Sequence, residues 1–365
     1  METTSGASIT AATSTTEHVW PQLGLRVAVL AGLLAGLIAV FLLSLMLGSV
    51  RIPLAEVLRI LLGGQPERAT WATIVLNFRL PRALTATLAG AALAVSGLQM
   101  QTLFRNPLAD PFVLGVSSGA SLGVALVVLS VGIAASAPVL AVSGLLSNIS
   151  LVLAACLGSA AVLLLVLLLA RHVQSSVTLL ILGIMIGYLT GAIVSLLLYF
   201  SIVERIQAYI MWTFGSFGGV TWSQMHVLAP TILIGLGLAF TLSKSLNALL
   251  LGEAYAHSMG LPVKMARFWI IVSAATLAGA VTAFCGPIAF LGIAVPHFCR
   301  NLFATSDHRV LMPAAVLLGA ICAISADLIA QVPGSDTVLP LNAVMALIGA
   351  PVVLWIILRR TRLYR

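Results

Sequence analysis

The stretch ISLVLAACLGSAAVLLLVLLLA, residues 149–170, runs for 22 positions without a charged side chain. A helix needs about 20 mostly apolar residues to cross a bilayer, whereas a strand of a membrane barrel alternates apolar and polar residues over about 10. Inside lipid, backbone N–H and C=O groups must be paired without water, and a helix does this within one segment. The stretch therefore predicts a membrane-spanning helix.

The whole chain has the same character. Hydrophobic residues make up 61% of its 365 residues and charged residues only 8%, against about 25% charged residues in soluble domains. The net charge of +8 falls in short loops and at the C-terminus, so we interpret it as a topology signal and expect no nucleic acid partner. The four cysteines lie in apolar runs without a CxxC pair, and we expect no metal site.

The apolar runs predict an all-α polytopic membrane protein with about ten transmembrane helices, surrounded by membrane lipid. Residues 1–24 are polar and are expected to form a disordered cytoplasmic tail. Residues 25–360 form the transmembrane domain, and residues 361–365 its cytoplasmic C-terminal end. The spans are placed at residues 25–47, 82–103, 112–133, 149–170, 177–200, 225–243, 268–283, 288–301, 310–330 and 339–358.

The positive residues favour an orientation with both termini in the cytoplasm. The first external loop, residues 49–81, opposes this rule because Arg51, Arg59 and Arg68 lie in it. The same loop contains a predicted amphipathic helix in residues 49–64, with its leucines and Val57 on one face and Glu56 off that face. Whether this helix lies on the membrane or under a partner stays open.

An internal repeat links two predicted spans. The sequence Leu-Ala-Gly-Ala occurs at 88–91 and again at 277–280, and in each copy a second glycine, Gly97 or Gly286, follows seven positions after the first. The copies lie five spans apart, in the second and the seventh, so they run in opposite directions across the membrane. Inverted repeats of this kind are typical of transport folds.

Few residues are placed to carry chemistry inside the membrane. Asp110 lies between two prolines before a helix start, so we favour a helix cap over a substrate contact. No series of acids or histidines crosses the bilayer, which argues against an ion-coupled secondary transporter. The chain has no P-loop, because neither of its lysines, Lys244 and Lys264, follows the glycine pattern that holds phosphates. No pair of side chains supports a membrane-embedded enzyme, so no catalytic residue is assigned.

Two double GxxxG patterns predict close helix crossings. We favour packing within one subunit over a dimer seam or a pathway wall. Between the sixth and seventh spans, residues 251–261 (LGEAYAHSMGL) predict a short helix ended by Gly260. A docking knob for a cytoplasmic partner and a plain connector are both open interpretations of this loop. The two glycine patterns are Gly115, Gly119 and Gly123, and Gly183, Gly187 and Gly191.

Several ordered motifs resemble a known family. They are RLPR at 79–82, AGAALAVSG at 89–97, RNPLADP at 105–111, LGVSSGA at 114–120, WTFGSFGGV at 212–220, GPIAFLG at 286–292, DHR at 307–309 and LPLN at 339–342. Over residues 25–360 the chain resembles the permeases of type II ABC importers, the FecCD/BtuC-like family, which imports iron–siderophores, haem and vitamin B12.

The resemblance implies a BtuC-like homodimer with a central pathway in the bacterial inner membrane. It also implies two cytoplasmic ATPase subunits, which would bind ATP and Mg, and an external substrate-binding protein. This chain itself would carry no cofactor. The expected function is import of a metal chelate, an iron–siderophore or haem, by alternating access. The alternative is vitamin B12 import, and an ion-coupled secondary transporter is the weakest candidate.

The resemblance also assigns roles to residues. The ATPase-coupling loop, within residues 247–263, includes Gly252, Glu253, Ala256, His257, Met259, Gly260 and Leu261, with Asp307, His308 and Arg309 in support. Pathway and gate residues are Ser175, Ser176, Gly183, Gly187, Tyr188 and Gly191. Binding-protein docking falls to Arg51, Arg59, Arg68 and Arg205. Structural roles fall to Asn106, Pro107, Asp110, Pro111, Gly115, Gly119, Gly286 and Pro287.

Overall fold

The computed structural model describes residues 19–130, 145–173, 175–332 and 338–362, and within these ranges it contains helices and no strands. The first part of the chain contains α1 (Val19–Met46), α2 (Leu54–Leu61), α3 (Ala69–Thr73), the π-helix η1 (Ile74–Arg79), α4 (Leu80–Leu103), the 3-10 helix η2 (Pro111–Leu114), α5 (Val116–Ser130), α6 (Leu145–His172) and α7 (Ser176–Tyr199). The second part contains α8 (Val203–Thr213), α9 (Trp222–Thr241), α10 (Ser243–Leu250), α11 (Glu253–Ser258), α12 (Val263–Cys285), α13 (Leu291–Phe303), α14 (His308–Ala330) and α15 (Leu341–Arg362).

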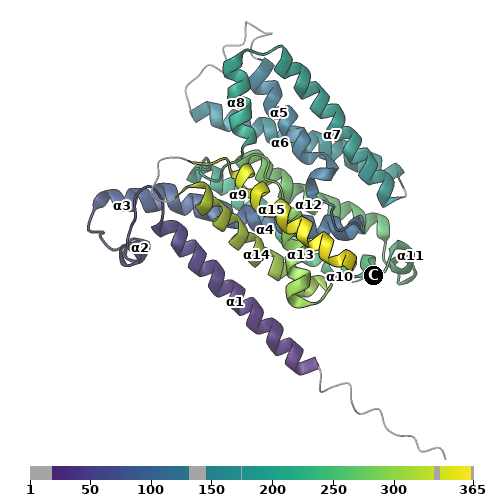
Figure 1. Ribbon diagram of the computed structural model, residues 1–365. Helices are drawn as coiled ribbons and strands as arrows, with labels where there is room; N and C mark the ends of the chain where they lie inside the picture. The colour runs from purple at the N-terminus through teal and green to yellow at the C-terminus, as the bar shows by residue number, and fades with distance from the viewer. Residues whose placement is uncertain (1–18, 131–144, 174, 333–337, 363–365) are drawn as a thin grey trace, which may run out of the picture.

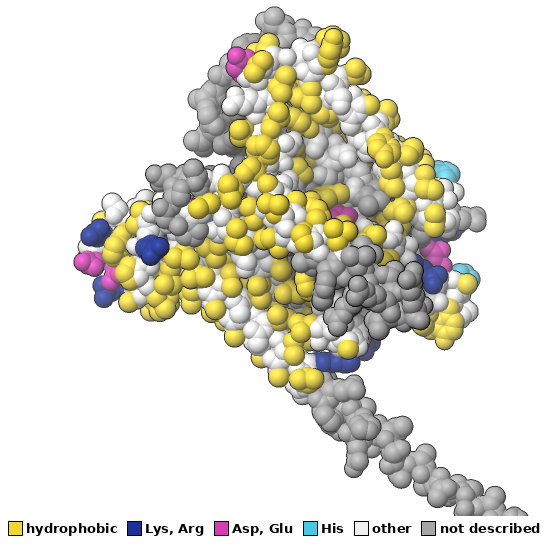
Figure 2. Space-filling view, in the orientation of Figure 1, with side chains coloured by type: hydrophobic (Ala, Val, Ile, Leu, Met, Phe, Trp, Pro, Cys, Tyr) yellow, Lys and Arg dark blue, Asp and Glu magenta, His cyan; other side chains and the backbone are white. Residues whose placement is uncertain are grey.

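The predicted spans correspond to helices. Within the described residues, seven helical segments are long and apolar enough to cross a membrane, and α5 and α15 contain shorter apolar stretches. The remaining predicted span matches the short helix α13. Figure 2 shows charged side chains over α2 and α3 at one end and around α11 at the other, with a hydrophobic band between them. The chain is therefore a multi-pass helical membrane protein.

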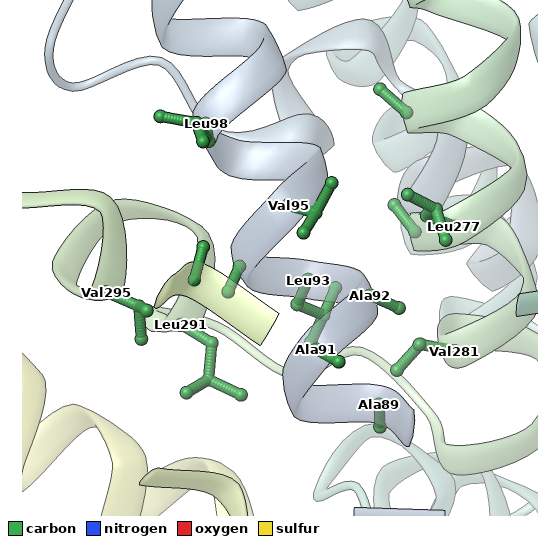
Figure 3. Packing of buried hydrophobic residues seen from close by; sticks show 14 of the residues in the cluster. Ala89, Ala91, Ala92, Leu93, Val95, Leu98, Leu277, Val281, Leu291 and Val295 are labelled. Carbon is green, nitrogen blue, oxygen red and sulfur yellow. The ribbon is translucent and has the colours of Figure 1, made fainter. Parts of the chain in front are cut away.

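Helix α4 forms the centre of the fold and contacts α9, α12, α13 and α14 (Figure 1). Its side chains are small, and Ala89, Ala92 and Val95 are fully buried. Figure 3 shows them between Leu277 of α12 and Leu291 of α13. Helices α5 to α8 form a second group, joined to the first by contacts of α12 with α5 and α6.

Two backbone contacts explain why α4 carries glycines. A Cβ at Gly90 would lie 2.2 Å from the carbonyl oxygen of Gly319 in α14, and one at Gly97 would lie 1.9 Å from that of Gly292 in α13. Any side chain at either site would force the helices apart.

The two copies of the repeat lie in α4 and α12, which contact each other. Their second glycines differ in environment. Gly97 lies inside α4, whereas Gly286 has a φ of 77° and ends α12.

Several predicted boundaries are wrong. Helix α1 begins at Val19, so the end of the predicted disordered tail is helical, while residues 1–18 lie outside the described residues. Helices α3 and η1 extend α4 outward, and α8 and α10 were not predicted, because these segments are too short or too polar to read as spans. The third span is interrupted at Gly115, and α13 starts at Leu291 because Phe290 has a φ of 70°.

The structure divides the predicted apolar face of α2. Val57 of that face is buried, and Glu56, which was predicted off the face, is buried beside it. The side chains of Leu54 and Leu58 are 39% and 41% exposed. Glu56 is accommodated because its carboxylate pairs with Arg59 at 2.7 Å and accepts a backbone hydrogen bond from residue 67. The leucines of α2 thus face away from the protein.

Candidate functional site

The predicted inner loop folds as α10 and α11, which contact each other at one end of the molecule (Figure 1). Leu246 and Ala256 are fully buried and seat these two helices on the core. Tyr255 and Met259 are 53% and 51% exposed, and the His257 side chain is exposed as well. Gly252 and Gly260 bound α11 with φ values of 105° and 84°, and Leu261 is half-buried.

An ion pair fixes the start of α11 to α12. The carboxylate of Glu253 lies 2.8 Å from the guanidinium of Arg267, whose side chain is buried. Arg267 also donates a hydrogen bond of 3.2 Å to the carbonyl oxygen of Val173, at the end of the α6 segment. One buried arginine therefore joins α11, α12 and the residues before the predicted gate.

The turn at Asp307 to Arg309 is bound to α10 by a side chain that the sequence analysis missed. Asn247 of α10 donates to the Asp307 carboxylate at 2.6 Å and accepts from the backbone N–H of His308 at 2.9 Å. Burial raises the pKa of Asp307, but hydrogen bonds from Arg309 N–H and Asn247, with the charge of Arg309, outweigh burial and leave that pKa lowered. The carboxylate therefore stays ionised as an acceptor, and Arg309 itself is exposed.

The loop before η2 is ordered by its own polar groups. Asp110 accepts a 3.0 Å hydrogen bond from the N–H of Phe112, the bond expected of a cap, and Pro111 begins η2. Asn106 accepts from the backbone N–H of residue 108 at 3.0 Å, and the carbonyl oxygen of Pro107 lies 3.0 Å from Nε2 of His297. These contacts indicate a structural role for the loop.

In the first double GxxxG pattern, two of the three glycines, Gly119 and Gly123, contact a neighbouring helix. A Cβ at Gly119 would lie 2.5 Å from the carbonyl oxygen of Gly158, and one at Gly123 would lie 2.0 Å from that of Ala154, both in α6. Gly115 is not part of this helix face, because it lies before α5 with a φ of 74°. The pattern thus marks a crossing within one subunit.

The second pattern lies on α7 and differs along its length. Gly183 is buried and a Cβ at Gly187 would contact Ser118, but a Cβ at Gly191 would meet nothing within 4 Å. Tyr188 is 70% exposed on this helix. Ser175 caps α7 through a hydrogen bond to its first turn, whereas the side chain of Ser176 lies outside the described residues. Helix α7 therefore presents an open apolar surface with one tyrosine in its middle.

The four predicted outer arginines do not form one cluster. Arg51 is exposed, Arg59 pairs with Glu56, and the guanidinium of Arg68 lies 5.2 Å from the ring centroid of Trp71. Arg205 is half-buried on α8, apart from the loop that contains α2 and α3 (Figure 1).

Two further arginines of the outer end have structural partners. Arg79 donates to the carbonyl oxygens of residues 45, 46 and 50 and so closes the end of α1. Arg82 forms a bidentate ion pair with Asp327 of α14, and its Nε lies 2.9 Å from Oδ2 of that carboxylate. Both arginines line an outer recess of about 510 Å³, together with Trp222 and Gln331.

The Gly286 and Pro287 turn at the same end is held by Asn342. Its amide donates to the carbonyl oxygens of Pro287 and Thr213 at 2.6 and 3.0 Å, and its oxygen accepts from Ala289 N–H at 3.1 Å. Asn342 thus ties together the starts of α13 and α15 and the end of α8.

The comparisons with known proteins agree with this architecture. The model of the FecCD transport family matches residues 36–359. The chain belongs to the FecCD transport family. Over 288 residues it is 38% identical to the vitamin B12 import system permease protein BtuC of Salmonella paratyphi A, covering 79% of this chain and 84% of that protein.

Two other similarities extend further along this FecCD chain. It is 37% identical over 330 residues to the hemin transport system permease protein HmuU of Yersinia pestis, covering 90% of this chain and 96% of that protein. A solved structure of a metal-chelate type ABC transporter in an inward-facing conformation matches 91% of this chain and 99% of its own, with a TM-score of 0.79 and 28% identity. The chain is an ABC importer permease of the FecCD/BtuC family.

Proposed function

We propose that this chain forms, as a homodimer, the pathway through which an external binding protein delivers a metal chelate to the cytoplasm. Haem or an iron–siderophore is the cargo that we favour. The observation that carries the proposal is the similarity to the hemin permease, at 37% identity over 330 residues, although a BtuC relative matches the same length at 36% identity. The similarity to a metal-chelate transporter structure supports the same class of cargo.

The exposed side of α7 supports the pathway assignment. Leu189 and Leu196 are more than 60% exposed, and Tyr199 is 81% exposed at its end. A wall of apolar side chains with a few hydroxyl groups holds no small ion strongly, and it suits a large chelate that is released easily. Two such surfaces facing each other in a homodimer would enclose the pathway, with Ser175 and Ser176 at its cytoplasmic end.

We assign the α10–α11 element to ATPase docking, because Tyr255 and Met259 project from a short helix that is anchored to the core by Glu253. Arg51, Arg59, Arg68 and Arg205 are proposed contacts for the binding protein. In this arrangement both termini lie in the cytoplasm, and ATP hydrolysis takes place on the partner subunits.

Vitamin B12 is the second candidate, favoured by the 38% identity to BtuC. Uptake into vesicles that contain this permease and its ATPase, measured with the binding protein present, distinguishes vitamin B12 from the metal chelates. Haemin, a ferric hydroxamate and cyanocobalamin are offered at equal concentrations with ATP. ATP-dependent uptake of haemin or the hydroxamate supports the proposal. Uptake of cyanocobalamin alone would show that vitamin B12 is the cargo, and uptake without the ATPase would refute the importer mechanism.

A further inference from the structure

A polar network at the inner end joins three helices that are far apart in the sequence. It contains Thr102 near the end of α4, His308 at the start of α14, and Asn247 in α10. Nε2 of His308 lies 2.8 Å from Oγ1 of Thr102, and Nδ1 lies 2.7 Å from Oδ1 of Asn247. Thr102 and His308 are buried, whereas Asn247 is half-buried.

The hydrogen bonds fix the orientation of Asn247 and His308. The backbone N–H of His308 can only donate, so the atom of Asn247 that it meets at 2.9 Å must be the oxygen. The same oxygen can only accept, which places the imidazole proton on Nδ1. The Asn247 amide nitrogen is left to donate to the Asp307 carboxylate. The one hydroxyl proton of Thr102 has two acceptors within reach, Nε2 of His308 at 2.8 Å and the carbonyl oxygen of Leu98 at 3.0 Å.

The network lies at one end of an antiparallel helix pair. At the outer end, Arg82 of α4 binds Asp327 of α14, and in the middle Gly90 and Gly319 bring the two backbones into contact. Thr102 and His308 complete the pair at the inner end. Helices α4 and α14 are therefore joined at three levels, and α10 contacts both of them.

We propose that Asn247 is the positioning residue that transmits movement of the α10–α11 element to the α4–α14 pair. This inference rests on the proposed docking of an ATPase at α10–α11. Glu253 ties the element to α12 by an ion pair, whereas the three hydrogen bonds of Asn247 reach α14 directly and α4 through His308. Contacts of this kind pass a displacement on, because the buried groups of His308 and Thr102 lose their partners if the helices separate.

Exchanging the residues at positions 247 and 307 conserves the net charge of the contact. Asn247→Asp alone keeps the oxygen that accepts from His308, but it adds a negative charge and sets a second carboxylate against Asp307. Adding Asp307→Asn restores the net charge, with a donor and an acceptor in exchanged positions. In the wild type the Asp307 oxygen that accepts from Asn247 also accepts from the N–H of Arg309, so the new amide has to turn its nitrogen to position 247 and its oxygen to Arg309. Asn301→Asp, at an exposed position of α13, is the matched control.

The measurement is hydrogen–deuterium exchange of the full complex of this permease with its ATPase in nanodiscs, with and without ADP–vanadate. In the wild-type complex we expect trapping to change exchange in α10–α11 and also at residues 98–104 and 308–312. With Asn247→Asp the change in α10–α11 persists, while the change at the ends of α4 and α14 falls by about 5-fold or more, the lower range of measured site-to-site coupling. The double variant and Asn301→Asp respond like the wild type.

The outcomes separate this inference from the proposed function. No response in α10–α11 of the wild-type complex refutes the docking assignment itself. A wild-type response that Asn247→Asp leaves intact at α4 and α14 overturns the role of Asn247 alone. If the single variant does not assemble with the ATPase, the double variant decides the question. A wild-type response of the double variant supports the role of the contact, whereas an assembled double variant without transmission to α4 and α14 overturns that role.

Discussion

Replacing Gly123 by alanine tests the close crossing of α5 and α6. The added Cβ would lie 2.0 Å from the carbonyl oxygen of Ala154, whereas ordinary contact begins at 3.4 Å. The shortfall is 1.4 Å (3.4 minus 2.0), and the obstacle is a backbone atom that cannot rotate away. The two helices must therefore separate along their contact.

The expected cost follows from two opposing effects. Overpacking a well-packed site costs about 1–3 kcal/mol, and this site belongs at the upper end because backbone meets backbone. Alanine gains up to about 1 kcal/mol of helix propensity over glycine. The net loss of unfolding free energy for Gly123→Ala is therefore about 2 kcal/mol.

Two positions in α9 provide the comparison. A Cβ at Gly235 would meet the flexible end of the Leu277 side chain at 2.8 Å, and one at Gly237 would meet nothing within 4 Å. Unfolding free energies measured by SDS titration in mixed micelles should fall most for Gly123→Ala, less for Gly235→Ala, and not at all for Gly237→Ala. Equal stability of the Gly123 and Gly237 variants would refute the reasoning from backbone contact.

Three further predictions concern polar contacts and the pathway. Asp327→Asn should lower the free energy of unfolding by about 3 kcal/mol, because it leaves the Arg82 guanidinium without its buried counter-charge; SDS titration measures the loss, and a wild-type value would contradict it. Glu253→Gln should weaken association with the ATPase, since it removes the ion pair that holds α11 to Arg267; co-purification yields at rising salt measure this, and unchanged yields would contradict it. Tyr188→Cys should react with a membrane-impermeant maleimide in the assembled transporter if α7 faces the pathway, and a lack of labelling in every nucleotide state would place this face in lipid.

The membrane helices and the exposed leucines of α2 were predictable from the sequence, whereas the burial of Glu56 was not. Long runs such as residues 149–170 have one solution in lipid, so their helices follow from composition. A stripe of leucines identifies the protein core only where water is the alternative environment. At a membrane surface, lipid or a partner can accept leucines, so Leu54 and Leu58 stay exposed while the charged Glu56 is buried with Arg59.

The residues of the candidate sites divide in the same way. The loop at α11 was predicted because glycines and an exposed Met and Tyr interrupt a hydrophobic sequence. Asn247 had no motif that could reveal it, since its importance depends on His308, which is 61 residues away in the chain. Arg82 has no assigned role in the sequence analysis, and only the position of Asp327 shows that it is a structural partner.

The three contacts between α4 and α14 limit how the permease can move. Sliding one helix along the other would break the Arg82–Asp327 pair at one end and the contact of His308 at the other. Separating them would open the backbone crossing at Gly90, which no side chain is available to fill. Helix α7, by contrast, presents an open face at Gly191, and the side-chain hydrogen bonds of its Thr190 and Ser195 stay within the helix. With an ATPase docked at α10–α11 as proposed, we expect a displacement that enters at α10 to be carried by the α4–α14 pair as one body, and the movement that changes access to occur between this body and the group that contains α7.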